Sequence, residues 1–113
     1  MALSKTGLGL FTSCSASSTT TVLTVASSKT NYVRGILLHN THTGTVNVKA
    51  HIVPNGGSVG TGNVCLEVNI ASKDTYFLEY NFPIILGTNG DTIQIVVGVG
   101  AAINALVIGD KDS

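Results

Sequence analysis

Thr45-Val46-Asn47-Val48-Lys49-Ala50-His51-Ile52-Val53 is the stretch that decides the fold. Apolar and polar residues alternate along it, so that Val46, Val48, Ala50 and Ile52 share one side, and Thr45, Asn47, Lys49 and His51 share the other. This period of two predicts a β-strand with a buried and a solvated face. The following Pro54-Asn55-Gly56-Gly57 ends the strand, because proline lacks the N–H of a sheet ladder and glycine readily takes positive φ.

The same period recurs on both sides of this stretch. It predicts strands over residues 20–25, 32–40, 63–70, 75–82, 92–97 and 104–108, with Pro83-Ile84-Ile85-Leu86 as a short apolar segment between two of them. We expect inward faces made of Val64, Leu66, Val68 and Ile70, and of Ile93, Ile95 and Val97. In 32–40 the alternation groups Val33 with Leu37 and His39, and Tyr32 with Ile36 and Leu38. About eight short strands without a helical period predict an all-β fold, an antiparallel β-sandwich or jelly roll.

The length and the cysteines bound the organisation of the chain. Its 113 residues suit one domain, and we expect residues 1–18, rich in Ser, Thr and Gly, to form an extended or flexible N-terminal arm before a single sandwich at 19–113. We expect synthesis in a cytoplasm and no membrane partner, because neither a signal peptide nor a long apolar run is apparent. Cys14 and Cys65 are expected to be two lone thiols, with a disulfide left open.

The charge balance excludes two classes of protein. Six Lys and Arg balance six Asp and Glu, and charged residues make up only 11% of the chain. A nucleic-acid-binding domain would carry a basic surplus to offset phosphate charge, so we expect no nucleic-acid partner. Disorder requires low hydrophobicity and high net charge, and this composition has neither.

The pattern of candidate catalytic and metal-binding residues does not indicate an enzyme. Gly56-Gly57-Ser58-Val59-Gly60 matches the G-x-S-x-G pattern, but that motif needs a helix after the serine and a strand follows here. His39 and His42 flank a turn, and His51 is expected on the wet face of its strand, so their spacing does not build the three or four ligands of a zinc site. We therefore expect no catalytic residues, no cofactor and no metal, with a metal site shared between symmetry-related chains left open.

Aromatic residues are the more suggestive feature. Four of the six lie between positions 76 and 82, and a strand would place Tyr76, Tyr80 and Phe82 on one face and Phe77 beside Glu79 on the other. Core packing is the simpler interpretation of the first three, whereas Phe77 beside a charge favours an interface. The candidate interface residues are Phe11, Tyr32, Tyr76, Phe77, Tyr80 and Phe82. A neutral surface rich in Thr, Ser and Asn is also inexpensive to desolvate, which is typical of a protein that oligomerises.

From Val22 to Gly109 the chain resembles a group of small bacteriophage virion proteins. The resemblance depends on the order and spacing of these motifs: Thr24-Val25, Lys29-Thr30, Ile36-x-Leu38-x-Asn40-Thr41, Ile52-Val53-Pro54-Asn55-Gly56-Gly57-Ser58, Asn63, Asp74-Thr75, Pro83-Ile84-Ile85-Leu86, Asn89-Gly90-Asp91-Thr92-Ile93 and Leu106-Val107-Ile108-Gly109. The Val-Pro-Ala-Gly turn usual in the group is replaced by Ala26-Ser27-Ser28.

The resemblance implies a non-enzymatic virion protein made in the host cytoplasm. It favours a capsid cement (decoration) protein that forms a homo-oligomer, preferably a trimer, binds the major capsid protein or other virion proteins, and stabilises the phage head. The arm would then add avidity by reaching along the capsid or a neighbouring copy. A neck, tail or baseplate protein is one alternative. A carbohydrate-binding adhesion module that stacks sugars on Tyr32 or on the aromatics at 76–82 is another.

Overall fold

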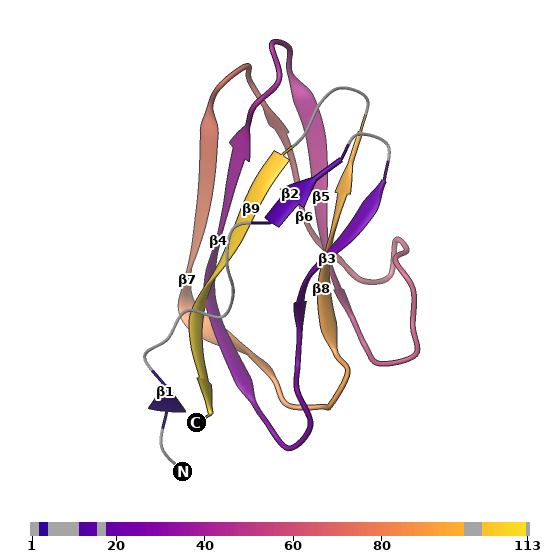
Figure 1. The fold of residues 1–113 in the computed structure, drawn as a ribbon, viewed down its shortest axis with the longest axis vertical. Helices are drawn as coiled ribbons and strands as arrows, with labels where there is room; N and C mark the ends of the chain where they lie inside the picture. Colours follow the sequence, from indigo (N-terminus) through magenta and orange to yellow (C-terminus); the bar gives the residue numbers. More distant parts are fainter. Residues whose placement is uncertain (1–2, 5–11, 16–17, 99–102, 113) are drawn as a thin grey trace.

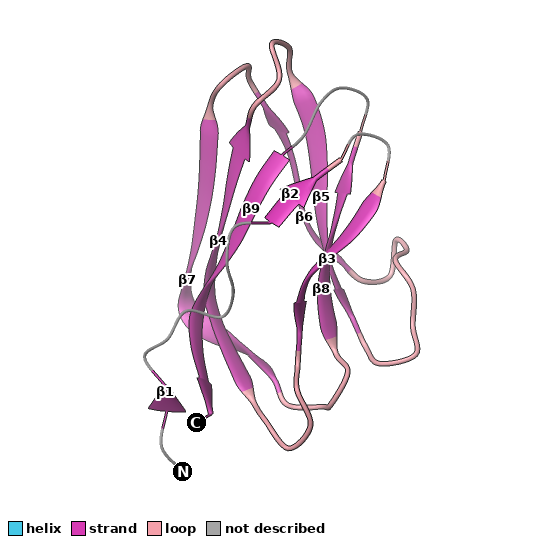
Figure 2. Cartoon of the chain, viewed as in Figure 1, coloured by secondary structure: helices cyan, strands magenta, loops and turns pink. Residues whose placement is uncertain are grey.

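The structure is a computed structural model that describes residues 3–4, 12–15, 18–98 and 103–112. This part of the chain is built of strands without a helix (Figure 2), and so it holds no helix that could cross a membrane. The strands are β1 (Leu3–Ser4), β2 (Thr12–Cys14), β3 (Thr19–Thr24), β4 (Asn31–Asn40), β5 (Val46–Val53), β6 (Val64–Ile70), β7 (Thr75–Leu86), β8 (Thr92–Val97) and β9 (Ile103–Asp112). The predicted segment at 83–86 is thus the end of β7 rather than a separate element.

Two antiparallel sheets face each other (Figure 1). Sheet A has the order β1-β9-β4-β7, with β2 also paired to β9, and sheet B has the order β3-β8-β5-β6. From β2 to β5 the chain changes sheet at every connection, and after the β5–β6 hairpin it does so again up to β9. This is the arrangement of a jelly roll. The predicted all-β sandwich is confirmed.

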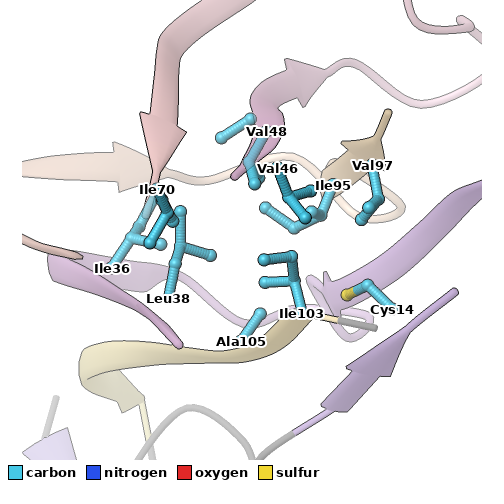
Figure 3. Close-up of a cluster of buried hydrophobic side chains, with 11 residues drawn as sticks. Cys14, Ile36, Leu38, Val46, Val48, Ile70, Ile95, Val97, Ile103 and Ala105 are labelled. Carbon is cyan, nitrogen blue, oxygen red and sulfur yellow. The ribbon is translucent and has the colours of Figure 1, made fainter. Parts of the chain in front are cut away.

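The core fills the space between the sheets. Side chains of sheet A, including Ile36 and Leu38, point toward Val46, Val48 and Ile95 of sheet B (Figure 3), and each is at most 1% exposed. A second buried cluster at the other end of the sandwich is formed by Leu23, Val25, Val33, Leu86, Ile93 and Val107. The predicted inward faces of residues 46–52 and 92–97 are confirmed, with Ile52 partly buried against the second cluster.

The predicted faces of the strand over 32–40 are wrong at its start. Val33 is buried together with Ile36 and Leu38, whereas Leu37 and His39 are only partly buried on the opposite face. The cause is a bulge between Val33 and Gly35, where the pairing of β4 shifts against both β7 and β9. A bulge inserts one extra residue into a strand, so the side chains before it lie on the opposite faces of the sheet from those that a regular alternation predicts.

The predicted exposure is wrong for one residue of β5 and one of β6, and a second bulge is the cause. The β5–β6 pairing shifts between Ala50 and His51, so Val64 lies opposite His51 on the outer face instead of pointing inward. Val64 is 38% exposed, while Leu66, Val68 and Ile70 of the same strand pack on the core as predicted. His51 is only 5% exposed, because residues 58–63 fold back over it.

The N-terminal segment contributes to the sandwich. β2 pairs with β9 through Thr12, Ser13 and Cys14, and the Cys14 side chain is 0% exposed in the main core cluster. Residues 12–14 of the predicted arm are therefore part of the folded body, while the remaining division into an arm and a domain stays a prediction.

Candidate functional site

The groups that could carry chemistry lie apart from one another. His39 Nδ1 is 2.8 Å from Thr75 Oγ1, and His51 Nδ1 is 2.8 Å from Asn63 Oδ1. Ser58 lies on an exposed loop that leads through a turn into β6 rather than into a helix. Among the described residues, no three His, Cys, Asp or Glu side chains converge in a way that could hold a metal ion. The more distinctive features are two surfaces, one on each sheet.

The outer face of sheet A carries the first surface. Phe77, Leu37 and Leu106 are direct partners across β7, β4 and β9, and so their side chains form one row on this face. Glu79, Gly35 and Ile108 form the next row, and Ile85, Tyr32 and Asp110 form a third. We call the apolar members of these rows the sheet-A face: Tyr32, Leu37, Phe77, Ile85, Leu106 and Ile108.

Solvent reaches much of the sheet-A face. Ile85 is 62% exposed, Phe77 48% and Ile108 36%. At its margin Arg34 Nε donates to Asp110 Oδ2 at 3.0 Å, and Glu79 in the second row adds one exposed carboxylate to this side of the sheet. Such a contiguous apolar patch on a sheet face is typical of an interaction site.

β7 leaves β4 for four residues beside this face. Glu79 pairs with Gly35 and Ile84 pairs with Val33, so Tyr80, Asn81, Phe82 and Pro83 lie opposite Arg34 alone. Pro83 fits there, because an unpaired stretch of an edge strand needs no ladder N–H. Phe82 is 85% exposed as a result, which contradicts its predicted place on one face with Tyr76 and Tyr80.

The six predicted interface residues differ in their exposure to solvent. Phe77 and Phe82 are exposed, and Tyr32 is half-buried within the sheet-A face. Tyr76 and Tyr80 pack against the core, as the simpler interpretation had it. Phe11 lies outside the described residues. Four further members of the sheet-A face were not predicted, because strand register brings them together and no local motif marks them: Leu37, Ile85, Leu106 and Ile108.

Partial desolvation shifts the pKa of three side chains. It raises the pKa of the Cys14 thiol and of the Cys65 thiol, and both cysteines are free. It also raises the pKa of Tyr80, where the neighbouring Cys65 adds to the effect. The Cys65 thiol donates to the Ala50 carbonyl oxygen at 3.3 Å, and within the described chain the Tyr80 hydroxyl finds no well-aligned partner. Cys14 is buried and Cys65 is exposed, and a raised pKa leaves both thiols less nucleophilic at neutral pH than a thiol with a lowered pKa.

The second surface is a hollow on the outer face of sheet B, which we call the sheet-B hollow. Its volume is about 290 Å³. Lys49 and His51 of β5, Val64 and Glu67 of β6, Val96 of β8 and loop residues 59–61 line it. The bulge at Ala50/His51 creates the hollow, because it turns Val64 outward beside His51.

Asn63 holds the loop that forms one wall of this hollow. Its Oδ1 accepts from the Gly60 N–H at 3.1 Å and lies 2.8 Å from His51 Nδ1, and its Nδ2 donates to the Ser58 carbonyl at 2.9 Å. The wall therefore depends on one amide side chain that bonds both to the strand and to the loop. The hollow was not predicted from the sequence, because the alternation along residues 45–53 predicts an exposed His51, and only its burial would have indicated a loop folded over it.

Comparisons with known proteins show similarity of fold. No protein-family model matches the chain, and no curated protein matches it. Among solved structures, a chain of the T13 particle of infectious bursal disease virus has a TM-score of 0.57 at 12% identity over 97% of this chain, and a chain of the Gx strain of that virus has a TM-score of 0.54 at 13% identity, also over 97%. This chain spans only 30% and 31% of the length of those two viral chains.

A third solved structure matches from end to end. A protein of the Bacillus endospore appendages, described as a novel family of disulfide-linked pili, has a TM-score of 0.50 at 18% identity, over 100% of this chain and 98% of its own. At these identities, the three similarities establish a common fold.

Proposed function

We propose that this chain is a non-enzymatic structural subunit of a virus particle, which assembles with copies of itself and with other virion proteins. The observation that carries the proposal is the sheet-A face. A neutral sandwich presents Phe77, Ile85 and Ile108 on one pleated surface with 48%, 62% and 36% exposure. Burying such a surface drives association, and few ions must be desolvated to do so.

The solved structures of similar fold support a place in a virus particle. Two of the three structures belong to particles of a virus, and all three come from large protein assemblies. The motifs between Val22 and Gly109 point the same way through their resemblance to phage virion proteins. Within this class we favour a capsid cement protein on the phage head, a homotrimer that binds the major capsid protein. A neck, tail or baseplate subunit is the alternative within a virion.

The test is assembly of the purified chain and its copy number on particles. Size-exclusion chromatography with light scattering should give an oligomer at micromolar concentration, a trimer for the cement protein. Quantitative mass spectrometry of purified particles should give many copies for a head protein and few for a neck or tail protein. A chain that stays monomeric and binds no particle contradicts the proposal. Replacement of Phe77 by Asp should weaken attachment to particles without unfolding the sandwich.

A filament subunit is the second candidate function. One observation favours it: the match to the endospore-appendage protein covers both chains almost completely, whereas the viral chains are about three times longer than this one. Negative-stain electron microscopy of the purified chain separates the two, because a filament subunit polymerises alone and a cement protein requires a shell to decorate. Glycan binding that is lost in Tyr32→Ala would instead favour the carbohydrate-binding module.

A further inference from the structure

An exposed ring and an unfilled hollow lie on different sheets of the same sandwich. Phe82 projects from the excursion of β7 in sheet A and, at 85%, is the most exposed large apolar side chain of the described residues. The sheet-B hollow has a volume of about 290 Å³ and opens on the outer face of β5, β6 and β8. Among residues 3–4, 12–15, 18–98 and 103–112, nothing covers the Phe82 ring or fills the hollow.

The chemistry of the hollow suits an aromatic ring. The side chains of Val59, Val64 and Val96 supply apolar walls, and the lining also includes the oppositely charged Lys49 and Glu67. A cation above a ring is attracted by the electrons of its face, while methyl groups pack on its edges. Cavities of about 150 Å³ already hold benzene, so a phenyl group fits in the available space.

The surroundings of Phe82 match the rim of the hollow. Its neighbours Asn81 and Pro83 carry no charge, and Glu79 lies three residues before it on the same strand. Glu79 itself lies in the rows of the sheet-A face, and in the hollow Lys49 is the direct cross-strand partner of Glu67, so the two opposite charges of the lining offset each other. An uncharged, exposed ring (the knob) therefore matches a hollow with valine walls and no excess charge from Lys49 and Glu67.

We propose that Phe82 of one copy inserts into the sheet-B hollow of a second copy. The contact is head-to-tail, since knob and hollow are different surfaces, and its repetition generates a closed ring or a filament. The inference rests on the proposed function and deepens it: it assigns the contact between copies to Phe82 and the hollow, and leaves the sheet-A face for the other partner.

Complementation between two variants tests this contact. Phe82→Ala removes the knob, and Val64→Lys places a charge on the wall of the hollow at an edge-strand position where lysine is well tolerated. Each variant alone should associate about 30-fold more weakly or worse, as for a central aromatic contact residue. An equimolar mixture should form one-to-one dimers, because the first variant offers an intact hollow and the second an intact ring. Light scattering measures both results.

Matched controls separate this contact from general damage. Asn81→Ala, next to the knob, and Asn69→Lys, on the same strand as Val64 but outside the hollow, should assemble as wild type does. If Val64→Lys fails to fold, Thr61→Trp obstructs the hollow from an exposed loop position. Wild-type assembly by Phe82→Ala, or a mixture that stays monomeric, overturns the inference and leaves the proposed function standing. A monomeric wild type also overturns the inference, and a monomeric wild type that binds no particle contradicts the proposed function itself.

Discussion

The ring of Phe77 lies over Gly35. A Cβ atom on Gly35 would be 3.1 Å from Phe77 Cε1 and 2.8 Å from the Leu78 carbonyl oxygen, both closer than side chains ordinarily approach. Phe77 pairs with Leu37 across the strands and Gly35 pairs with Glu79, so the ring covers a diagonal neighbour. Because Gly35 has no side chain, about half of the Phe77 side chain is buried against the sheet, and the other half stays exposed to a partner.

Gly35→Ala should destabilise the sandwich by about 1–3 kcal/mol, because the added methyl group displaces the Phe77 ring and meets backbone that cannot move freely. Urea unfolding measures the change. Gly60→Ala is the matched control, since a Cβ there meets nothing within 4 Å, and we expect little change. Equal stability of the two variants would mean that the ring does not depend on Gly35.

How far the sequence predicts this fold is clearest on β5. The alternation from Val46 to Ile52 predicts its inward face correctly, because a strand with one wet face repeats every two residues. The exposure of Val64 and the burial of His51 were not predictable in this way. Both follow from the bulge at Ala50/His51, and a bulge is fixed by the pairing of two strands rather than by either strand alone.

The candidate surfaces were predictable only in part for the same reason. Phe77 was indicated by its charged neighbour, and it is exposed. Phe82 was assigned to the face of Tyr76 and Tyr80, and the four-residue excursion of β7 moves it into solvent. Ile108 becomes part of the sheet-A face only because β9 pairs with β4, a contact between residues far apart in the sequence.

Asn40→Ala should cost about 2–4 kcal/mol of the free energy of unfolding. The Asn40 side chain is fully buried, donates to the carbonyl oxygens of Gly44 and Ile70 at 2.8 and 2.9 Å, and accepts from the His42 N–H at 2.7 Å. Its removal takes a partner from the buried Ile70 carbonyl and from the partly buried Gly44 carbonyl and His42 N–H, and each loss carries a desolvation cost. Thermal and urea unfolding measure the loss.

Asn47→Ala is the control for Asn40→Ala, because the Asn47 side-chain amide donates to the exposed side chains of Glu67 and Asn69. It should cost less than about 1 kcal/mol. A loss for Asn40→Ala no larger than this would contradict the assigned role of the buried amide.

Asn63→Ala should release the loop over the sheet-B hollow without unfolding the sandwich. The Gly60 N–H loses its acceptor at 3.1 Å, and the Ser58 carbonyl loses its donor at 2.9 Å. Local opening then becomes easier than global unfolding, so amide hydrogen exchange should rise at residues 58–62 and stay unchanged in β4 and β9. Uniformly faster exchange in all strands would show instead that Asn63 supports the whole fold.

Stability should fall in alkali. Burial raises the pKa of Cys14 and Cys65 above the ordinary 9.0 and that of Tyr80 above 10.0, so the folded chain holds these protons after the unfolded chain has lost them. The free energy of unfolding then decreases with pH, because the folded state binds more protons. The contribution is complete below about pH 9 and is lost progressively above it.

Urea unfolding between neutral pH and about pH 10.5 measures this loss. Cys14→Ala should lower stability at neutral pH through lost packing but make the alkaline decline shallower. An unchanged slope in that variant would assign the decline to other groups.

Two truncations should separate the folded part of the N-terminus from the predicted arm. Deletion of residues 1–11 removes β1 but spares β2, and we expect the free energy of unfolding to change by less than about 1 kcal/mol. Deletion of residues 1–14 also removes the buried Cys14 and the pairing of β2 with β9, and should cost about 2 kcal/mol or more. Circular dichroism during urea unfolding distinguishes them. If residues 1–11 act as an arm, the shorter deletion also weakens attachment to particles because avidity is lost, and attachment equal to that of the full chain would refute the arm.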